Sequence, residues 1–359
     1  MNEQLAEVSN LLIVVSIVVY VLGLIGFSAD LAAATQRSSD ERLARKEQEG
    51  AAMQLASVGA VAGGSGAGAV IAGAASDATG TGAPSGGPLS QPTPPRTVGA
   101  RGFAYAMTVV AVLLHGSGMV LRGVITGRVP WANMYEFSMS GAAVLVLLFL
   151  AISVRRRDLR LLGTFVLLPA LVVMLIAQTF WIVPAAETTP SLQNSHWLVI
   201  HVVIAILSTG MFALGALIAI LQLLQGRHET LLARRAADGG DLHVWGRAGA
   251  VLERLPSAKQ LEGLSYRIHA IAFVGWTFTL IFGAIWASQA WGRFWNWDPK
   301  EVWTFITWVV YACYLHARAT RGFRGGKAAW FALAGFLCVI FNYTIVNTVI
   351  NGLHSYSGL

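Results

Sequence analysis

The chain has 359 residues, of which 55% are hydrophobic and only 12% are charged. About a quarter of the residues of a soluble globular protein are charged, so this composition excludes a soluble protein and indicates an all-α, multi-pass membrane protein. The formal net charge is +7, but the basic residues fall between apolar runs, which indicates membrane orientation rather than nucleic-acid binding.

Eight stretches lack Asp, Glu, Lys and Arg and can be compared with the ~20 residues that a helix needs to cross ~30 Å of hydrocarbon. The predicted transmembrane helices are Leu11–Phe27, Ala104–Leu121, Phe137–Val154, Leu161–Val183, Trp197–Leu224, Ile268–Ala290, Val302–Ala317 and Ala328–Ile350. The seventh is short, and the aliphatic stem of Arg318 can extend it toward the interface.

A different kind of sequence separates the first two predicted helices. Residues 36–49 are of mixed charge, and residues 50–100 are mostly Gly, Ala, Ser, Thr and Pro. This composition is typical of a flexible linker. The sequence therefore predicts an N-terminal transmembrane helix at 1–30, a flexible cytoplasmic linker at 31–100 and a seven-helix domain at 101–359.

The placement of basic residues predicts the orientation. One side of the membrane receives 21 of the 25 lysines and arginines, in the linker and in the segments Arg155–Arg160, Arg227–Arg267 and Arg318–Lys327. The opposite side receives Arg122, Arg128, Arg293 and Lys300. Because cytoplasmic loops carry the excess of Lys and Arg, both termini are predicted to lie on the extracytoplasmic side.

A Trp-rich loop at residues 291–301, WGRFWNWDPKE, is predicted to lie on the extracytoplasmic side. One interpretation is structural. Trp rings collect at membrane interfaces, and Asp298-Pro299-Lys300-Glu301 predicts a helix start with Asp as N-cap, Pro at N1 and Glu at N3. The other interpretation is a binding wall for a flat apolar ligand such as a porphyrin, with the charge of Asp298 orienting the loop through Arg293 or Lys300. The sequence leaves both open.

Two histidines share one depth on the same side: His201 one turn into the fifth predicted helix, and His354 just past the eighth. Such a pair suits bis-imidazole ligation of a haem iron. His316 lies ~22 Å deeper than Glu301, near the cytoplasmic face, at 1.5 Å per residue. Of the other histidines, His115 and His269 are interpreted as structural residues, His196 as a loop surface residue, and His228 and His243 as solvated cytoplasmic residues.

The segment WGRFWNWDPKEVWTFITWVVYACYLHAR resembles the WWD signature of the haem-handling membrane proteins of cytochrome c maturation. More narrowly, it resembles the CcsA/ResC-type subunit of the two-component (system II) cytochrome c synthase, often labelled CcsB in actinobacteria. The segments GRVPWANMYE, SHWLVIHV and NGLHSYSG match in the same order. The resemblance covers about residues 101–359.

The resemblance implies roles for individual residues. His201 and His354 correspond to the two external ligands of haem iron, and His316 to an intramembrane histidine that holds haem in transit. The haem-presenting loop corresponds to Trp291, Trp295, Trp297 and Asp298, with Trp303 as a further haem contact. The thiols of a Cys-x-x-Cys-His segment in an apocytochrome then add to the vinyl groups of haem b. This chain has two cysteines, Cys313 and Cys338, and no CxxC motif.

The resemblance also implies partners and a location. The expected partners are a ResB/Ccs1-like membrane subunit, apocytochrome c and a thioredoxin-like thiol reductant, in the lipid bilayer and without nucleic acid. The chain would be one subunit of a haem lyase in the bacterial plasma membrane, with its active site extracytoplasmic. Three alternatives remain: a WWD component of the multi-subunit maturation system, for haem delivery or ligation; a haem exporter without ligation chemistry; and a b-type cytochrome. The LHSY end and the eight-helix layout argue against the first, and the lack of paired intrahelical histidines argues against the last.

Overall fold

The computed structural model describes residues 2–62, 99–184, 195–239, 244–320 and 322–354. All regular structure in these ranges is helical, which confirms the predicted all-α class. The elements are α1 (Asn2–Ala62), α2 (Ala100–Thr126), α3 (Met134–Arg155), the 3₁₀ helix η1 (Arg157–Leu162), α4 (Gly163–Phe180), α5 (His196–Ala237), α6 (Gly246–Leu252), α7 (Ala258–Trp291), α8 (Pro299–Ala319), α9 (Gly326–Tyr343) and α10 (Ile345–Thr348).

The chain divides into two units, residues 1–33 with 99–359 and residues 34–98. In the second unit α1 remains helical to Ala62, whereas the sequence predicted a flexible linker from residue 31. The physical reason is local composition, because residues 40–54 are rich in Ala, Glu, Gln, Lys and Arg, which are strong helix formers. The Gly- and Pro-rich remainder, 63–98, lies outside the described residues, and the three-part division of the chain stays a prediction.

Seven helical segments in the described chain are long and apolar enough to cross a membrane: Glu3–Ala33, Ala100–Thr126, Met134–Arg155, Arg157–Phe180, His196–Ala237, Ala258–Trp291 and Gly326–Thr348. The eighth predicted span falls on α8, which has 21 residues and packs on α9. Its first turn carries Lys300 and Glu301, and its last turn carries His316 and Arg318, so α8 is less apolar than the others. An eighth crossing stays a prediction.

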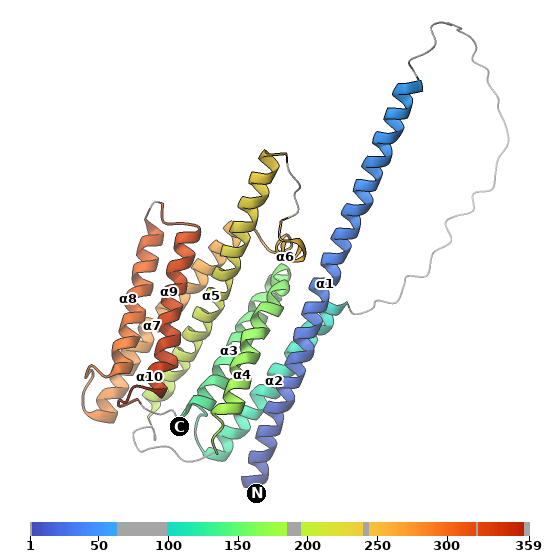
Figure 1. The fold of residues 1–359 in the computed structure, drawn as a ribbon. Helices are drawn as coiled ribbons and strands as arrows, with labels where there is room; N and C mark the ends of the chain where they lie inside the picture. Colours follow the sequence, from blue (N-terminus) through green and yellow to red (C-terminus); the bar gives the residue numbers. More distant parts are fainter. Residues whose placement is uncertain (1, 63–98, 185–194, 240–243, 321, 355–359) are drawn as a thin grey trace, which may run out of the picture. The chain divides into compact units, whose positions relative to one another are not determined.

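The loops of the first unit lie at two opposite ends (Figure 1). The connections after α3, α5 and α8 are at one end, and those after α2 and α7, together with α10, are at the other. This segregation matches the two sets of segments that the charge distribution separated. Which end faces the cytoplasm stays a prediction.

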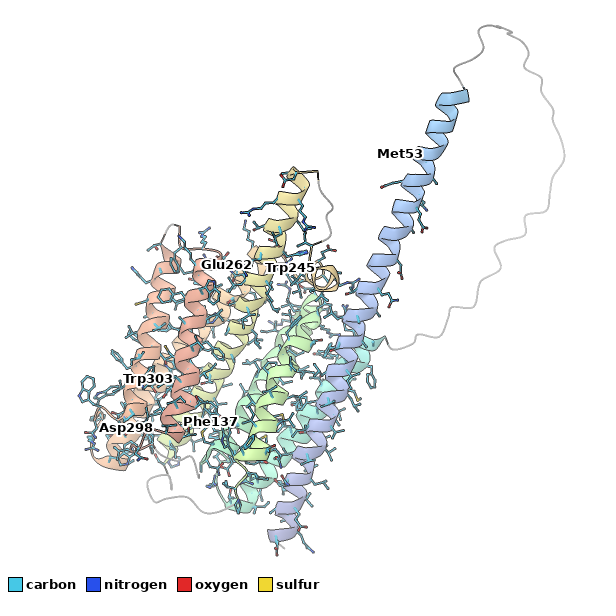
Figure 2. The ribbon with its side chains drawn as sticks, viewed as in Figure 1. Met53, Phe137, Trp245, Glu262, Asp298 and Trp303 are labelled. Carbon is cyan, nitrogen blue, oxygen red and sulfur yellow. The ribbon has the colours of Figure 1, made fainter. Side chains whose placement is uncertain are left out.

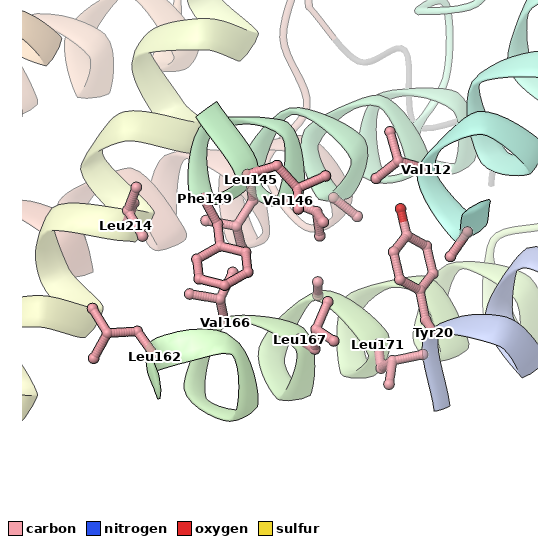
Figure 3. Packing of buried hydrophobic residues seen from close by; sticks show 14 of the residues in the cluster. Tyr20, Val112, Leu145, Val146, Phe149, Leu162, Val166, Leu167, Leu171 and Leu214 are labelled. Carbon is pink, nitrogen blue, oxygen red and sulfur yellow. The ribbon is translucent and has the colours of Figure 1, made fainter. Parts of the chain in front are cut away.

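Helix α5 is central to the packing of the first unit, because it contacts α3, α4, α6, α7 and α9. One hydrophobic cluster joins α5 to α1–α4, and a second joins it to α7, α8 and α9. Figure 3 shows part of the first cluster, with Phe149 of α3 beside Val166 of α4. Small residues permit the close approach of helices. Gly210 does so between α5 and α3, because a Cβ at this position would lie only 2.8 Å from Val144 Cγ1.

Candidate functional site

The Trp-rich loop joins the end of α7 to the start of α8. Gly292, in the left-handed region with φ 72°, ends α7 as its N–H donates to the Ser288 carbonyl. Asp298 is the N-cap of α8 with Pro299 after it, and Glu301 Oε2 accepts a hydrogen bond from Asp298 N at 3.1 Å. The predicted capping box is therefore confirmed.

The carboxylate of Asp298 also ties this loop to the segment after α10. Its Oδ2 accepts a hydrogen bond from His354 Nδ1 at 2.7 Å, and its Oδ1 accepts one from Leu353 N at 2.6 Å. A Cβ at Gly352 would lie 2.6 Å from Asp298 Oδ1, so only glycine permits this approach. The two interpretations of Asp298 are not exclusive, because one carboxylate both caps α8 and holds His354.

These hydrogen bonds determine the charge state of Asp298, which lies in the loop and is 6% exposed. Burial raises the pKa of its carboxyl group, but hydrogen bonds from His354 and from the backbone of Leu353 outweigh burial and hold the pKa below its usual range. Asp298 is therefore ionised at neutral pH. Because an ionised carboxylate can only accept hydrogen bonds, His354 carries a proton on Nδ1.

His201 is oriented by α7. Its Nδ1 lies 2.9 Å from the Thr279 carbonyl oxygen, and since a carbonyl only accepts, Nδ1 carries a proton. In the neutral imidazole this tautomer leaves the lone pair on Nε2. A Cβ at Gly283 would lie 2.8 Å from His201 Cε1, so this glycine makes the room for the imidazole. The ring stacks on Trp286 with centroids 6.1 Å apart and planes at 13°.

Trp286, which is 2% exposed, contacts both histidines. Its ring centroid is 6.1 Å from that of His201 and 5.8 Å from that of His354. The sequence analysis missed Trp286 because it lies inside an apolar run. A usable signal was present, since Thr279, Gly283 and Trp286 recur at intervals of four and three residues and so share one face of a helix.

A cavity of about 520 Å³ opens beside these rings, within the range of ~300–1,000 Å³ that is usual for small-molecule sites. Its wall comes from the loop after α2, the first turn of α3, α5 as far as Thr209, α7 from Trp276 to Ala287, the Trp-rich loop with the start of α8, the end of α9, and Asn347 of α10 with the segment after it. Three of the predicted site residues line it: His201, Trp295 and His354. His196, interpreted as a surface residue, is exposed and also lines the cavity.

The other predicted loop residues lie around this cavity rather than on its wall. Trp291 packs behind His354, with centroids 4.9 Å apart. Trp297 is 74% exposed and has φ 59°, in the left-handed region that is unfavourable for a residue other than glycine. Trp303 packs on Phe341 of α9 at 4.0 Å. Of the four tryptophans predicted as site residues, Trp295 is thus on the cavity wall and Trp291 packs on His354, whereas Trp297 and Trp303 are in neither position within the described chain.

His316 lies in the last turn of α8 and is exposed. It is at the opposite end of that helix from Asp298, and the structure does not bring it to the cavity. Figure 2 shows Asp298, Trp303 and Phe137 toward one end of the first unit and Glu262 toward the other.

The Lys300 ammonium forms no direct ion pair with Asp298 in the described chain, because it donates to Asn342 O and Asn347 Oδ1. Orientation of the loop through Arg293 stays a prediction. The interpretation of one histidine was wrong. His228 was expected to be a solvated residue but is 1% exposed, because α5 continues to Ala237 and α6 packs on it. His115 and His269 are buried, as a packing role requires, and His243 lies outside the described residues.

Comparisons with known proteins agree with this architecture. Residues 131–354 match the family described as Cytochrome C assembly protein. "Cytochrome c biogenesis protein CcsA" of Parasynechococcus marenigrum is 35% identical over 264 residues, covering 71% of this chain and 86% of its own length. The protein of the same name from Chlorella vulgaris is 35% identical over 280 residues (73% and 86%), and that of Gloeobacter violaceus is 33% identical over 291 residues (70% and 85%).

The helical fold and these matches define a multi-pass membrane protein of cytochrome c maturation. The family match covers more than half of the chain, and two CcsA proteins are 35% identical to it. Together these matches identify the family within that class. The chain belongs to the CcsA-type family of cytochrome c biogenesis proteins.

Proposed function

We propose that the chain holds haem b in this cavity, with His201 and His354 as axial ligands of the iron, and presents it for attachment to apocytochrome c. One observation carries the proposal: two histidines from distant parts of the chain line one cavity and contact one indole, that of Trp286. Family membership supports haem handling in general.

The donor set suits haem better than a bare metal ion. In the described part of the chain, no group of three or more His, Cys, Asp or Glu side chains is arranged to hold a metal. An iron already held by four porphyrin nitrogens needs only two protein ligands. Trp286 and Trp295 supply the aromatic surface that a porphyrin face requires.

The hydrogen bonds of both histidines support the ligand role. Histidines that bind a metal through one nitrogen usually donate the other N–H to a carboxylate or a carbonyl, which fixes the tautomer and the ring orientation. His354 donates to the Asp298 carboxylate, and His201 donates to the Thr279 carbonyl. Asp298 is thus a positioning residue for His354.

The ligation chemistry needs little beyond positioning. Each thiol of the apocytochrome adds its sulfur and its hydrogen across one vinyl double bond, forming a thioether with no net oxidation and no leaving group. Both thiols come from the substrate. The contribution of this chain is to hold the ring in register with the incoming Cys-x-x-Cys-His segment, whose own histidine then replaces one axial ligand and releases the product.

The proposal extends to transit and partners. Haem would enter from the cytoplasmic side of a bacterial plasma membrane, be held near His316, and reach the extracytoplasmic cavity. The exposure of His316 on α8 suits a haem held between this chain and a ResB/Ccs1-like membrane subunit. A thioredoxin-like reductant would keep the substrate thiols reduced.

Haem spectroscopy of the purified full-length chain tests the axial ligands. We expect a low-spin bis-imidazole spectrum for the wild type, its loss in His201→Gly and in His354→Gly, and its recovery when imidazole is added. His316→Ala should keep the spectrum of supplied haem while lowering the haem that co-purifies from cells. An unchanged low-spin spectrum in the double variant of His201 and His354 would overturn the assignment.

A further inference from the structure

The cavity wall carries a lysine that has no role in the account given so far. Lys300, in the first turn of α8, lines the cavity. Its Nζ donates to the Asn342 carbonyl oxygen at 3.0 Å and to Asn347 Oδ1 at 2.8 Å. Both acceptors are neutral, and none of the ion pairs formed within the described ranges includes Lys300. Burial lowers the pKa of this amine to about 7, against the opposing effect of Asp298, and no carboxylate contacts its ammonium in the described chain.

A second positive group lines the same cavity, in the loop after α2. Arg128 donates to both carboxylate oxygens of Glu136, at 2.7 Å and 3.2 Å. Arg122 Nε donates to the same carboxylate at 2.8 Å. Glu136 is 0% exposed, so two guanidinium groups share one buried carboxylate. We call these three residues the Arg–Glu–Arg group, whose three side chains sum to a formal charge of +1.

Lys300 is linked through Asn347 to the first turn of α3, the turn that also carries Glu136. Met134 belongs to that turn, and its Sδ accepts a hydrogen bond at 3.3 Å from the Asn347 amide that also binds Lys300. Helix N-termini favour negative charge, which adds to the positive potential here.

The neighbouring carboxylates are directed elsewhere. Glu301 Oε2 accepts hydrogen bonds from Asn296 N and Asp298 N, and Asp298 binds His354. Neither carboxylate forms an ion pair with Lys300 or Arg128 in the described chain. The α3 side of the cavity is thus the side that attracts an anion.

We infer that Lys300 and the Arg–Glu–Arg group form the subsite for the two propionate carboxylates of haem. This inference rests on the proposed function and adds an orientation to it. Haem is an apolar ring with two carboxylates on one edge, and two positive centres on one side of a largely apolar cavity complement that edge. Anchoring this edge at α3 turns the vinyl-bearing part of the ring away from α3.

Haem and its dimethyl ester, in which both propionates are neutral, provide a test that needs no mutation. We expect the wild-type chain in detergent to bind haem about tenfold or more tightly than the ester, since a charged hydrogen bond contributes about that factor. In Lys300→Met the preference should fall by most of this factor, and Lys300→Arg should restore part of it. Arg293→Met, which removes an exposed cation from the same loop, should keep the wild-type preference.

The spectrum recorded in each titration separates the two proposals. The wild-type chain could bind haem and its ester with equal affinity and still show the low-spin spectrum that depends on His201 and His354. That result would overturn the propionate subsite, but it would not contradict the two axial ligands. An unchanged preference in Lys300→Met would likewise overturn the part assigned to Lys300. A low-spin spectrum that survives loss of both histidines would instead contradict the proposed function.

Discussion

His354 donates a hydrogen bond from Nδ1 to Asp298 Oδ2 at 2.7 Å, although the two residues are 56 positions apart in the sequence. The same carboxylate oxygen accepts a bond from Lys300 N at 3.2 Å at the start of α8. One side chain therefore begins a helix and fixes the ring of a proposed iron ligand. Substitutions that separate these two tasks are informative.

Asp298→Asn and Asp298→Ala form the first comparison. Asn caps a helix about as well as Asp, whereas Ala costs about 1 kcal/mol at an N-cap. Asn nevertheless offers one acceptor oxygen where Asp offers two, so it cannot serve both His354 and Leu353. We expect both variants to lower cytochrome c yield at matched membrane levels, and only Asp298→Ala to lower thermal stability measurably. Full yield in Asp298→Asn would restrict the residue to capping.

Trp286 is expected to tolerate Phe and not Ala. Its Nε1 has no hydrogen-bond partner within the described structure, so Trp286→Phe loses no hydrogen bond and keeps an aromatic ring beside both histidines. Trp286→Ala removes a buried indole, a change that typically costs about 3–5 kcal/mol. Haem content and spectrum should be near normal in the first variant and lost in the second. Trp330→Ala, at a residue that is 67% exposed, is the control.

Gly283→Ala tests the orientation of His201. A methyl group there would overlap the imidazole, at 2.8 Å from its Cε1, so the ring must turn from the Thr279 carbonyl. We expect a weakened low-spin spectrum despite the higher helix propensity of Ala, which is worth about 1 kcal/mol. Gly116→Ala, where nothing lies within 4 Å of the added methyl, should keep the spectrum. Equal spectra in the two variants would contradict the packing described.

Trp295 and Trp297 should differ although they are two residues apart. Trp295 lines the cavity, and Trp297 is 74% exposed. Trp295→Ala should lower haem retention more than Trp295→Phe, which keeps an aromatic face. Trp297→Ala should retain haem and lower cytochrome c yield, because its exposed ring is accessible to a protein substrate. Haem content and yield measured on the same membranes distinguish the two residues, and equal haem loss in both Ala variants would be against this division.

Reporter fusions test the orientation. Fusions within the linker, at Gly240 and at Gly325 should report the cytoplasm, and one after Leu359 should report the outside. A cytoplasmic signal after Leu359 would contradict the orientation predicted from the 21 of 25 basic residues counted on one side, and would place the cavity on the wrong face for apocytochromes.

Local and periodic features were predictable from the sequence, and contacts between distant segments were not. The capping box at Asp298 lies within four residues, so its geometry follows from residue type. Seven of the eight predicted apolar runs fall on helical segments of the described chain that satisfy the length and composition of membrane spans. The bond between Asp298 and His354 depends on how α8 and α9 pack, and no spacing in the sequence encodes it. The sequence did not predict that α1 continues to Ala62. Residues 31–62 were interpreted as a flexible linker from their composition, although many of them are strong helix formers.

The binding of His354 by Asp298 has a consequence for biosynthesis. The ribosome completes α7, the Trp-rich loop and α8 before α9, α10 and the residues that follow them, so the part of the cavity wall that carries His201 is made before the part that carries His354. Asp298 then has only its capping partner, and the final segment must find the carboxylate after α9 has inserted. Under the proposed function, haem binding through both histidines is therefore open only to molecules in which the helical hairpin α8–α9 has already formed.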